Sequence, residues 1–238
     1  MCVLENPLFS ILEPVKSSSV EGELVRPEEN TGSEKSLNLA KRWLTECRNH
    51  SLCQNSDEHG DKILAVPTRL LHVGTSKYPN LRLCNVPPGT NYASLSHCWG
   101  KHVPIKLLSS NLTAFLKNIE ISKLPRTFRE AIEVVRHLDI EYIWIDSLCI
   151  IQDSKEDWAS EAALMHQVYS NAIVNIAADD ARDGTEGLFR DRDPRLCELV
   201  EVDVSWTKHH RGIYKAVDNA LWQSNMEKSM LNSRAWIL

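Results

Sequence analysis

The chain has 238 residues, of which 42% are hydrophobic, and its formal net charge is -5. This length suits one good-sized core with a tail, or at most two small domains, and the hydrophobic fraction excludes a mostly disordered chain. Because the net charge is negative, the composition does not indicate a positively charged surface for nucleic acid. No apolar run is long enough to span a membrane. We therefore expect a globular protein that binds neither nucleic acid nor membrane.

The cysteines and the N-terminus indicate a reducing compartment. An odd number of cysteines, several of them within apolar runs, does not form a disulfide framework. The N-terminal sequence MCVLENPLFSILEP lacks the basic start of a signal peptide and is interrupted by Glu5 and prolines. These features predict a cytoplasmic location. The seven cysteines are Cys2, Cys47, Cys53, Cys84, Cys98, Cys149 and Cys197.

The N-terminal part of the chain divides into two regions. Residues 1–36 include a stretch rich in Ser, Glu, Pro and Gly and are predicted to be a flexible lead-in. Residues 37–90 are predicted to be an N-terminal extension of the domain. It begins with a helix at 37–48, whose apolar stripe includes Trp43, and the strand-like stretches ILAVPTRLLHV and LRLCNV follow.

Residues 91–238 are predicted to be the core, in which strands alternate with helices. A capping-box pattern, Thr127 to Glu130, opens one helix, and Ser154 opens another. This alternation predicts an α/β fold with a mainly parallel central sheet flanked by helices, with added peripheral strands. The chain stops at the apolar sequence SRAWIL, which predicts truncation at the C-terminus. The main predicted elements are strand 92–99, a helix after Pro125, strand 142–146, helix 155–170, strand 172–178 and a hairpin at 198–217.

Asp146 is the first candidate for chemistry, because it ends the apolar strand YIWI. In open α/β sheets ligands bind outside the carboxyl ends of strands, where an acid suits ribose hydroxyls, a metal or proton transfer. The alternative is that Asp146 caps the following turn through its backbone.

Glu161 is the second candidate. Helical spacing places it within the apolar stripe of the helix at 155–170, beside Trp158 and Val168. A carboxyl turned toward a core is costly unless it is paired, so Glu161 is either a structural ion-pair partner or a catalytic acid that lines a pocket.

Further polar clusters carry weaker signals. His97 with Cys98 or Cys149 has the residue types of a thiol hydrolase, but nothing fixes an orienting group, and Cys in apolar strands is usually inert. The triplet Cys47, His50 and Cys53 has metal-ligand types but lacks a fourth ligand, so a structural role is favoured. No nucleophile elbow, phosphate-binding loop or dinucleotide fingerprint is present.

Five segments follow one another along the chain: YASLSHCWG, LPRTFREAI, YIWIDSLCIIQD, VYSNAIVNIAA and LNSRAWIL. Taken in this order, they resemble the fungal heterokaryon-incompatibility (HET) domain. The resemblance covers about residues 42–238 and is strongest at 92–178. The chain departs from the family pattern at His97, where Tyr is commoner, at Ala235, where Gly is usual, and in lacking the final Gln-Glu.

The resemblance implies a role in fungal self/non-self recognition and programmed cell death. It also implies a TIR-like, flavodoxin-like fold, which in some branches cleaves NAD with a pocket glutamate. Two readings remain open: a module that works through self-association or protein partners, and a hydrolase with NAD as substrate and no certain cofactor. Glu161 and Asp146 are the implied catalytic residues. The implied pocket residues are Ser96, Trp99, Gly100, Cys149, Gln152 and Arg234.

Overall fold

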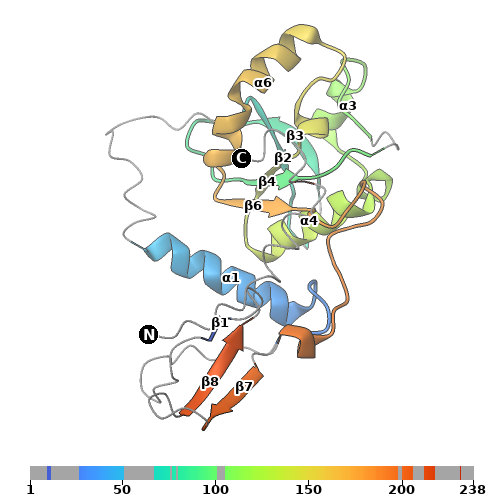
Figure 1. Cartoon of the computed structure of the whole chain (residues 1–238). Helices are drawn as coiled ribbons and strands as arrows, with labels where there is room; N and C mark the ends of the chain where they lie inside the picture. Colours follow the sequence, from blue (N-terminus) through green and yellow to red (C-terminus); the bar gives the residue numbers. More distant parts are fainter. Residues whose placement is uncertain are drawn as a thin grey trace.

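A five-stranded mixed sheet forms the centre of the fold (Figure 1). The structure is a computed structural model. The residues that it describes are 10–11, 27–50, 67–75, 77–78, 80–100, 105–197, 200–205, 212–217 and 231.

The strands of this sheet lie in the order β3-β2-β5-β4-β6. β4, β5 and β6 run parallel, because a helical crossover separates each from the next, whereas β2 and β3 are joined by a short connection and pair antiparallel. β2 also pairs antiparallel with β5. The fold is therefore mixed α/β, and the prediction of a mainly parallel sheet is only partly met, because two of the four strand pairs are parallel and two are antiparallel. The strand bounds are Arg69–His72 (β2), Arg82–Asn85 (β3), Ala93–Ser96 (β4), Tyr142–Trp144 (β5) and Val174–Ala177 (β6).

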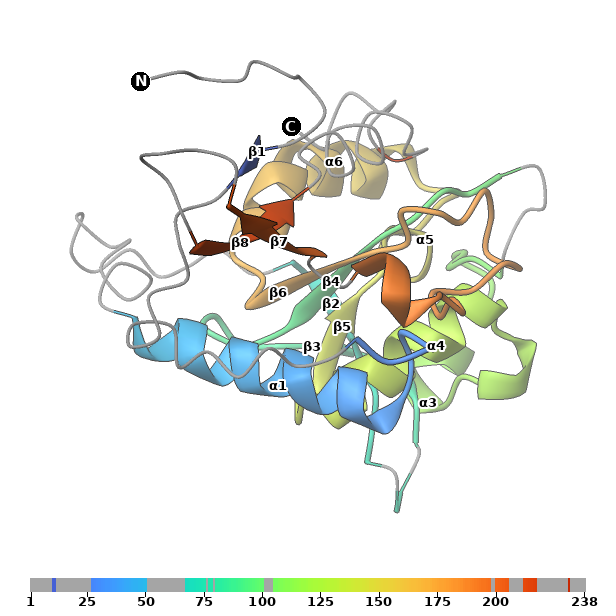
Figure 2. The ribbon, with the colours of Figure 1, turned by 60° about the horizontal axis from the view of Figure 1, so that its bottom comes forward.

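Helices cover both faces of the sheet. Figure 2 shows α6 on one side and α1 with α4 on the other. Short 3-10 turns lie at Ile121–Lys123 and Pro194–Cys197. The α-helices are Glu34–Asn49 (α1), Leu112–Lys117 (α3), Arg126–His137 (α4), Asp146–Cys149 (α5) and Lys155–Ser170 (α6).

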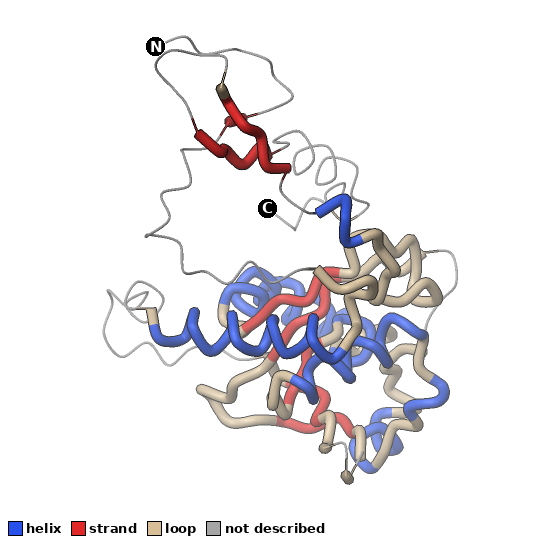
Figure 3. The backbone as a smooth tube through the Cα atoms, turned by 90° about the horizontal axis from the view of Figure 1, so that it is seen from below, coloured by secondary structure: helices blue, strands red, loops and turns tan. Residues whose placement is uncertain are grey.

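A second, three-stranded antiparallel sheet contains the predicted hairpin. β7 (Val200–Val204) pairs with β8 (Gly212–Val217), and β8 also pairs with β1 (Ser10–Ile11). Figure 3 shows this sheet at one end of the molecule, apart from the five-stranded sheet. The prediction of a hairpin at 198–217 is thus confirmed.

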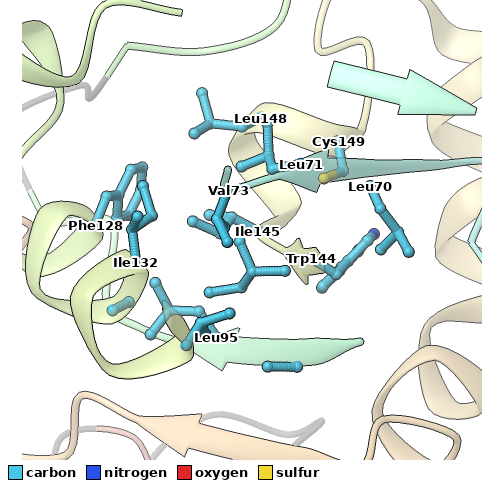
Figure 4. Close-up of a cluster of buried hydrophobic side chains, with 14 of the residues drawn as sticks. Leu70, Leu71, Val73, Leu95, Phe128, Ile132, Trp144, Ile145, Leu148 and Cys149 are labelled. Atoms are coloured by element: carbon cyan, nitrogen blue, oxygen red, sulfur yellow. The ribbon is translucent and has the colours of Figure 1, made fainter. Parts of the chain in front are cut away.

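The main core lies between the five-stranded sheet and α4. Phe128 and Ile132 of α4 face Leu95 and Ile145 of the sheet side, as Figure 4 shows, and all four are buried. On the opposite face the ring of Trp144 packs edge-on against Tyr169 of α6, with 5.5 Å between the ring centroids. Trp144, the last residue of β5, and Ile145, which follows it, therefore pack against helices on opposite faces of the sheet.

Helix α1 confirms the predicted helix at 37–48 but corrects its inner face. Leu37 is buried, and Ala40 and Leu44 pack against the core, whereas Trp43 is 59% exposed. At 100° per residue Trp43 lies about 120° from Leu37, outside the narrow stripe that packs on the body of the protein.

The start of α4 differs from the predicted capping box. The N-cap is Pro125, so Thr127 and Glu130 lie inside the helix and do not cap it. Thr127 Oγ1 instead accepts a hydrogen bond from the backbone N–H of Gly187 at 3.1 Å. Glu130 accepts from the N–H groups of Leu188 at 2.5 Å and Phe189 at 2.9 Å. The two side chains therefore fix a distant loop to the helix.

Glu130 should make the fold sensitive to acid. Burial alone would raise its pKa, but the Phe189 and Leu188 N–H groups and the Arg126 guanidinium together lower the pKa below the ordinary 4.5. A carboxyl with a lowered pKa in the folded state adds stability above its unfolded pKa and loses it as the pH falls through the folded pKa. Glu130→Gln should cost about 1–3 kcal/mol at neutral pH and flatten the acid limb of stability against pH. Urea unfolding between pH 7 and about pH 3 checks this; an unchanged acid limb would contradict it.

Candidate active site

The parallel part of the sheet creates a crevice at the carboxyl ends of β4 and β5. β4 lies between β5 and β6, and the chain passes from β4 to β5 through α4, then from β5 to β6 through α6. These two crossovers lie on opposite faces of the sheet (Figure 2). The reversal of direction leaves an opening next to the strand ends, which is where open α/β sheets bind ligands.

A cavity of about 720 Å³ occupies this edge. It is formed by the turn after β4, the start of α5, the connection from α5 to α6, and one face of α6. Its volume falls in the range of about 300–1,000 Å³ that is typical of small-molecule sites. The described residues that line it are Trp99, Asp146, Ile150, Gln152, Trp158, Ala162, Met165 and His166.

Two N–H groups hold the Asp146 carboxyl in place. Trp99 donates its indole N–H to Oδ2 at 2.8 Å, and the backbone N–H of Ser147 donates to Oδ1 at 2.6 Å. The ring of His97 lies nearly parallel to that of Trp99, with 6.5 Å between centroids, and its Nε2 is 3.8 Å from Asp146 Oδ1. Asp146 therefore bonds the backbone at the start of α5, close to what the alternative interpretation predicted, although the N-cap of α5 is Ile145. It also borders the cavity.

Gln152 closes the loop that follows α5. Its side-chain amide donates to the carbonyl oxygens of Asp146 at 3.1 Å and Ile150 at 3.0 Å, and its backbone N–H donates to Leu107 O at 2.9 Å. These bonds keep the connection between α5 and α6 against the cavity. Gln152 thus shapes the wall through contacts within the protein itself.

Arg69 forms a buried ion cluster at the same edge of the sheet. Because β2 runs antiparallel to β5, the first residue of β2 lies near the carboxyl end of β5. Arg69 Nη2 is 2.6 Å from Asp157 Oδ2 and 3.8 Å from Glu161 Oε1, and its Nε donates to Cys149 O at 2.7 Å. Asp157 Oδ2 also accepts from the N–H of Ile151 at 2.8 Å. The cluster joins β2, the end of α5 and the first turns of α6.

Glu161 belongs to this ion cluster and is not among the residues that line the cavity. Its side chain is 2% exposed, and its Oε2 atom has no hydrogen-bond partner among the described residues. The carboxyls of Asp146 and Glu161 are both close enough to influence the Cys149 thiol. Both carboxyls therefore lie near Cys149, but only Asp146 is among the described residues that line the cavity. The catalytic role of Glu161 stays a prediction.

Cys149 is poorly suited to nucleophilic chemistry. It is fully buried, and burial raises its pKa to about 12. A thiol nucleophile needs the thiolate form near neutral pH, so this environment gives no support to the thiol-hydrolase alternative. Cys98 is also buried.

The remaining predicted residues lie beside the cavity or outside the described part of the chain. Ser96 ends β4, and its carbonyl accepts from Ala178 N–H at 2.8 Å. Gly100 has φ +67°, and a Cβ there would collide with Asp183, so the turn requires glycine. Neither Ser96 nor Gly100 lines the cavity. Arg234 lies outside the described residues.

The predicted metal triplet is only partly described. Cys47 is exposed near the end of α1, His50 is its C-cap, and Cys53 lies outside the described residues. Among the residues that the structure describes, no three His, Cys, Asp or Glu side chains are grouped to hold a metal ion.

Four lining residues were not predicted from the sequence. Ala162, Met165 and His166 lie on α6, and Ile150 follows α5. The signal was present in the spacing, because Trp158, Ala162 and Met165 recur one helical turn apart. Such an apolar stripe indicates a face that packs on the core, whereas in the structure it borders the cavity.

Comparison with known proteins gave one match. The family model described as "Heterokaryon incompatibility protein (HET)" matches residues 92–238, more than half of the chain. No curated protein and no solved structure matched. Within the described part of the chain, no helix combines the length and apolar character needed to cross a bilayer. All the described residues that line the cavity fall inside the matched segment.

Proposed function

Because the chain belongs to the heterokaryon incompatibility (HET) family, we propose that it acts in an incompatibility-type response, in which self/non-self recognition between fungal cells leads to programmed cell death. The cavity that Asp146 borders is the proposed working site. We further propose that the domain acts in the cytoplasm and passes its signal on by self-association or through protein partners.

One observation carries the proposal. The cavity draws its walls from parts of the sequence between Trp99 and His166, and all of them lie in the segment that matches the family. The sequence motifs of residues 92–100 and 142–153 supply Trp99, Asp146 and Gln152, whose side chains are locked by hydrogen bonds. A site whose side chains are fixed in advance is suited to binding a ligand without a large ordering cost.

Substitution of Asp146 tests the function of the cavity. Induced expression of the chain in a filamentous fungus should arrest growth, and Asp146→Asn should restore growth because the charge at the cavity is lost. Trp43→Ala is the matched control, since Trp43 is exposed on α1 and lies outside the cavity. Colony growth and uptake of a vital dye are measured, with melting temperature as the check on folding.

Two outcomes would contradict this proposal. Growth arrest that persists in a stably folded Asp146→Asn variant would show that the cavity is not the working site. Absence of arrest with the unaltered chain, at a protein level confirmed by immunoblot, would remove the incompatibility role itself.

A NAD-cleaving hydrolase with a TIR-like, flavodoxin-like site is the second candidate. It is favoured by one observation, the fixed carboxyl of Asp146 in a cavity at the carboxyl ends of parallel strands. The same experiment separates the two candidates when Glu161→Gln is added and NAD is measured in the extracts. Growth arrest without NAD loss supports the assembly module, whereas NAD loss that Asp146→Asn or Glu161→Gln abolishes supports the enzyme.

A further inference from the structure

The cavity at the carboxyl edge of the sheet has a net negative character. Among the described residues that line it, Asp146 is the one carboxyl and His166 the one histidine, and none is a lysine or an arginine. With histidine counted as neutral, Asp146 is the one formal charge of the described lining. The Asp146 side chain is 22% exposed, so its charge is presented to the cavity and not sealed in the core. A carboxylate in a concave, partly apolar site attracts positive charge and repels anions.

Two tryptophans border the same cavity. Trp99 is backed by the parallel ring of His97 and held by its bond to Asp146, so its indole is fixed beside the carboxyl. Trp158 is 55% exposed although it is large and apolar, and it lies at the first turns of α6. The faces of indole rings carry partial negative charge and attract cations. Aromatic and carboxyl groups therefore favour the same sign of ligand charge.

The other walls are largely apolar. Ile150, Ala162 and Met165 offer hydrocarbon and thioether surface, which suits a ligand with an apolar body. A bare metal ion does not fit these groups, because the described residues offer no cluster of three metal-ligating side chains.

We propose that this cavity binds an organic cation, a molecule with an apolar body and one positive charge. The inference rests on the proposed function only in taking the same cavity as the working site. The charged head lies near Asp146 against the indole of Trp99, and the apolar body lies along Met165 toward Trp158. Charge and aromatic surface together select this class over neutral or anionic molecules of the same shape.

A pair of probes tests the proposal with the full chain. 2-Phenylethylamine is a cation at pH 7, and 2-phenylethanol has nearly the same shape without the charge. Isothermal titration should show the amine binding at least about tenfold more tightly than the alcohol, because only the cation gains from the carboxylate. Asp146→Asn should reduce this ratio to about one, since the variant keeps the size of the side chain and removes its charge.

A second variant keeps the test informative if Asp146→Asn disturbs the turn. Trp158 is exposed, so Trp158→Ala should leave the fold intact and weaken amine binding by about threefold to tenfold. Trp43→Ala, at an equally exposed tryptophan of α1, should change nothing. Equal binding of the two probes, tighter binding of the alcohol, or no binding of either up to about 10 mM would overturn the proposal.

Failure of this inference and failure of the proposed function give different results. If growth arrest depends on Asp146 while the amine does not bind preferentially, the ligand class is wrong and the function stands. If the amine binds preferentially while the unaltered chain causes no arrest, the ligand class is supported and the incompatibility role is contradicted.

Discussion

Arg69→Met is expected to lower the free energy of unfolding by about 3–5 kcal/mol. Arg69 is 8% exposed and lies within ion-pair distance of both Asp157 and Glu161. Removing the guanidinium leaves the Glu161 carboxyl buried at 2% exposure, and the described residues offer its Oε2 no hydrogen bond. A buried charge without its partner is far more costly than a lost surface contact.

The control for this prediction is a surface arginine. Arg42 pairs with Glu46 at 3.7 Å on α1, and both side chains are about half exposed. Arg42→Met should therefore cost no more than about 0.5 kcal/mol. Urea unfolding of both variants measures the difference. A loss with Arg69→Met as small as that with Arg42→Met would show that the cluster adds little.

The double variant Arg69→Met/Glu161→Gln identifies the source of the loss. If the unpaired carboxyl causes it, neutralising Glu161 should recover part of the lost stability, and the two substitutions should not be additive. Strict additivity would place the role of Arg69 in its other bond, the one to Cys149 O, which fixes the end of α5.

Helix boundaries were the most predictable part of the fold, and α6 shows why. Ser154 accepts from the N–H of Asp157 at 3.2 Å, and the helix runs over Lys155–Ser170 as the local sequence indicates. The predicted capping box of Thr127 and Glu130 was wrong, because the backbone N–H groups that these side chains bind lie about 60 residues later in the chain. A capping pattern identifies suitable side chains but not the backbone groups that they will meet.

The orientation of α6 depended on contacts that the sequence does not reveal. At 100° per residue Trp158, Ala162 and Met165 share one direction, and Glu161 with Val168 lies about 60–80° away. The structure buries Glu161 and Val168, so the helix turns its acid toward Arg69 and its apolar stripe toward the cavity. Helical spacing correctly placed Glu161 at a buried position, but its partner is on a strand that begins far earlier in the chain.

The part of the cavity at the end of β5 could be predicted from the sequence, whereas the part on α6 could not. Asp146 follows from the rule for carboxyl ends of strands, and Trp99 and Gln152 follow from the family resemblance. The part of the cavity on α6 requires knowledge of how that helix is rotated against the sheet. The antiparallel direction of β2 against β5 was equally unpredictable, because the sequence of a short apolar strand does not indicate the direction of its neighbour.

Trp144→Ala is expected to cost about 3–5 kcal/mol, the second large effect. Trp144 is fully buried in β5, and its ring forms a T-shaped pair with Tyr169 on α6, with 5.5 Å between the centroids. Alanine would leave a void on the face of the sheet that α6 covers. The helix that supplies Trp158, Ala162 and Met165 to the cavity would lose a main anchor, so hydrogen exchange of α6 amides should become faster.

Trp144→Phe separates packing from hydrogen bonding at the same position. The indole N–H of Trp144 is buried and has no hydrogen-bond partner among the described residues. Phenylalanine keeps an aromatic ring against Tyr169 and removes this unsatisfied donor, which offsets part of the lost contact area. Trp144→Phe should therefore cost less than about 2 kcal/mol in urea unfolding followed by circular dichroism. If phenylalanine costs as much as alanine, the indole N–H is bonded in solution, and packing against α6 is not the main contribution of this residue.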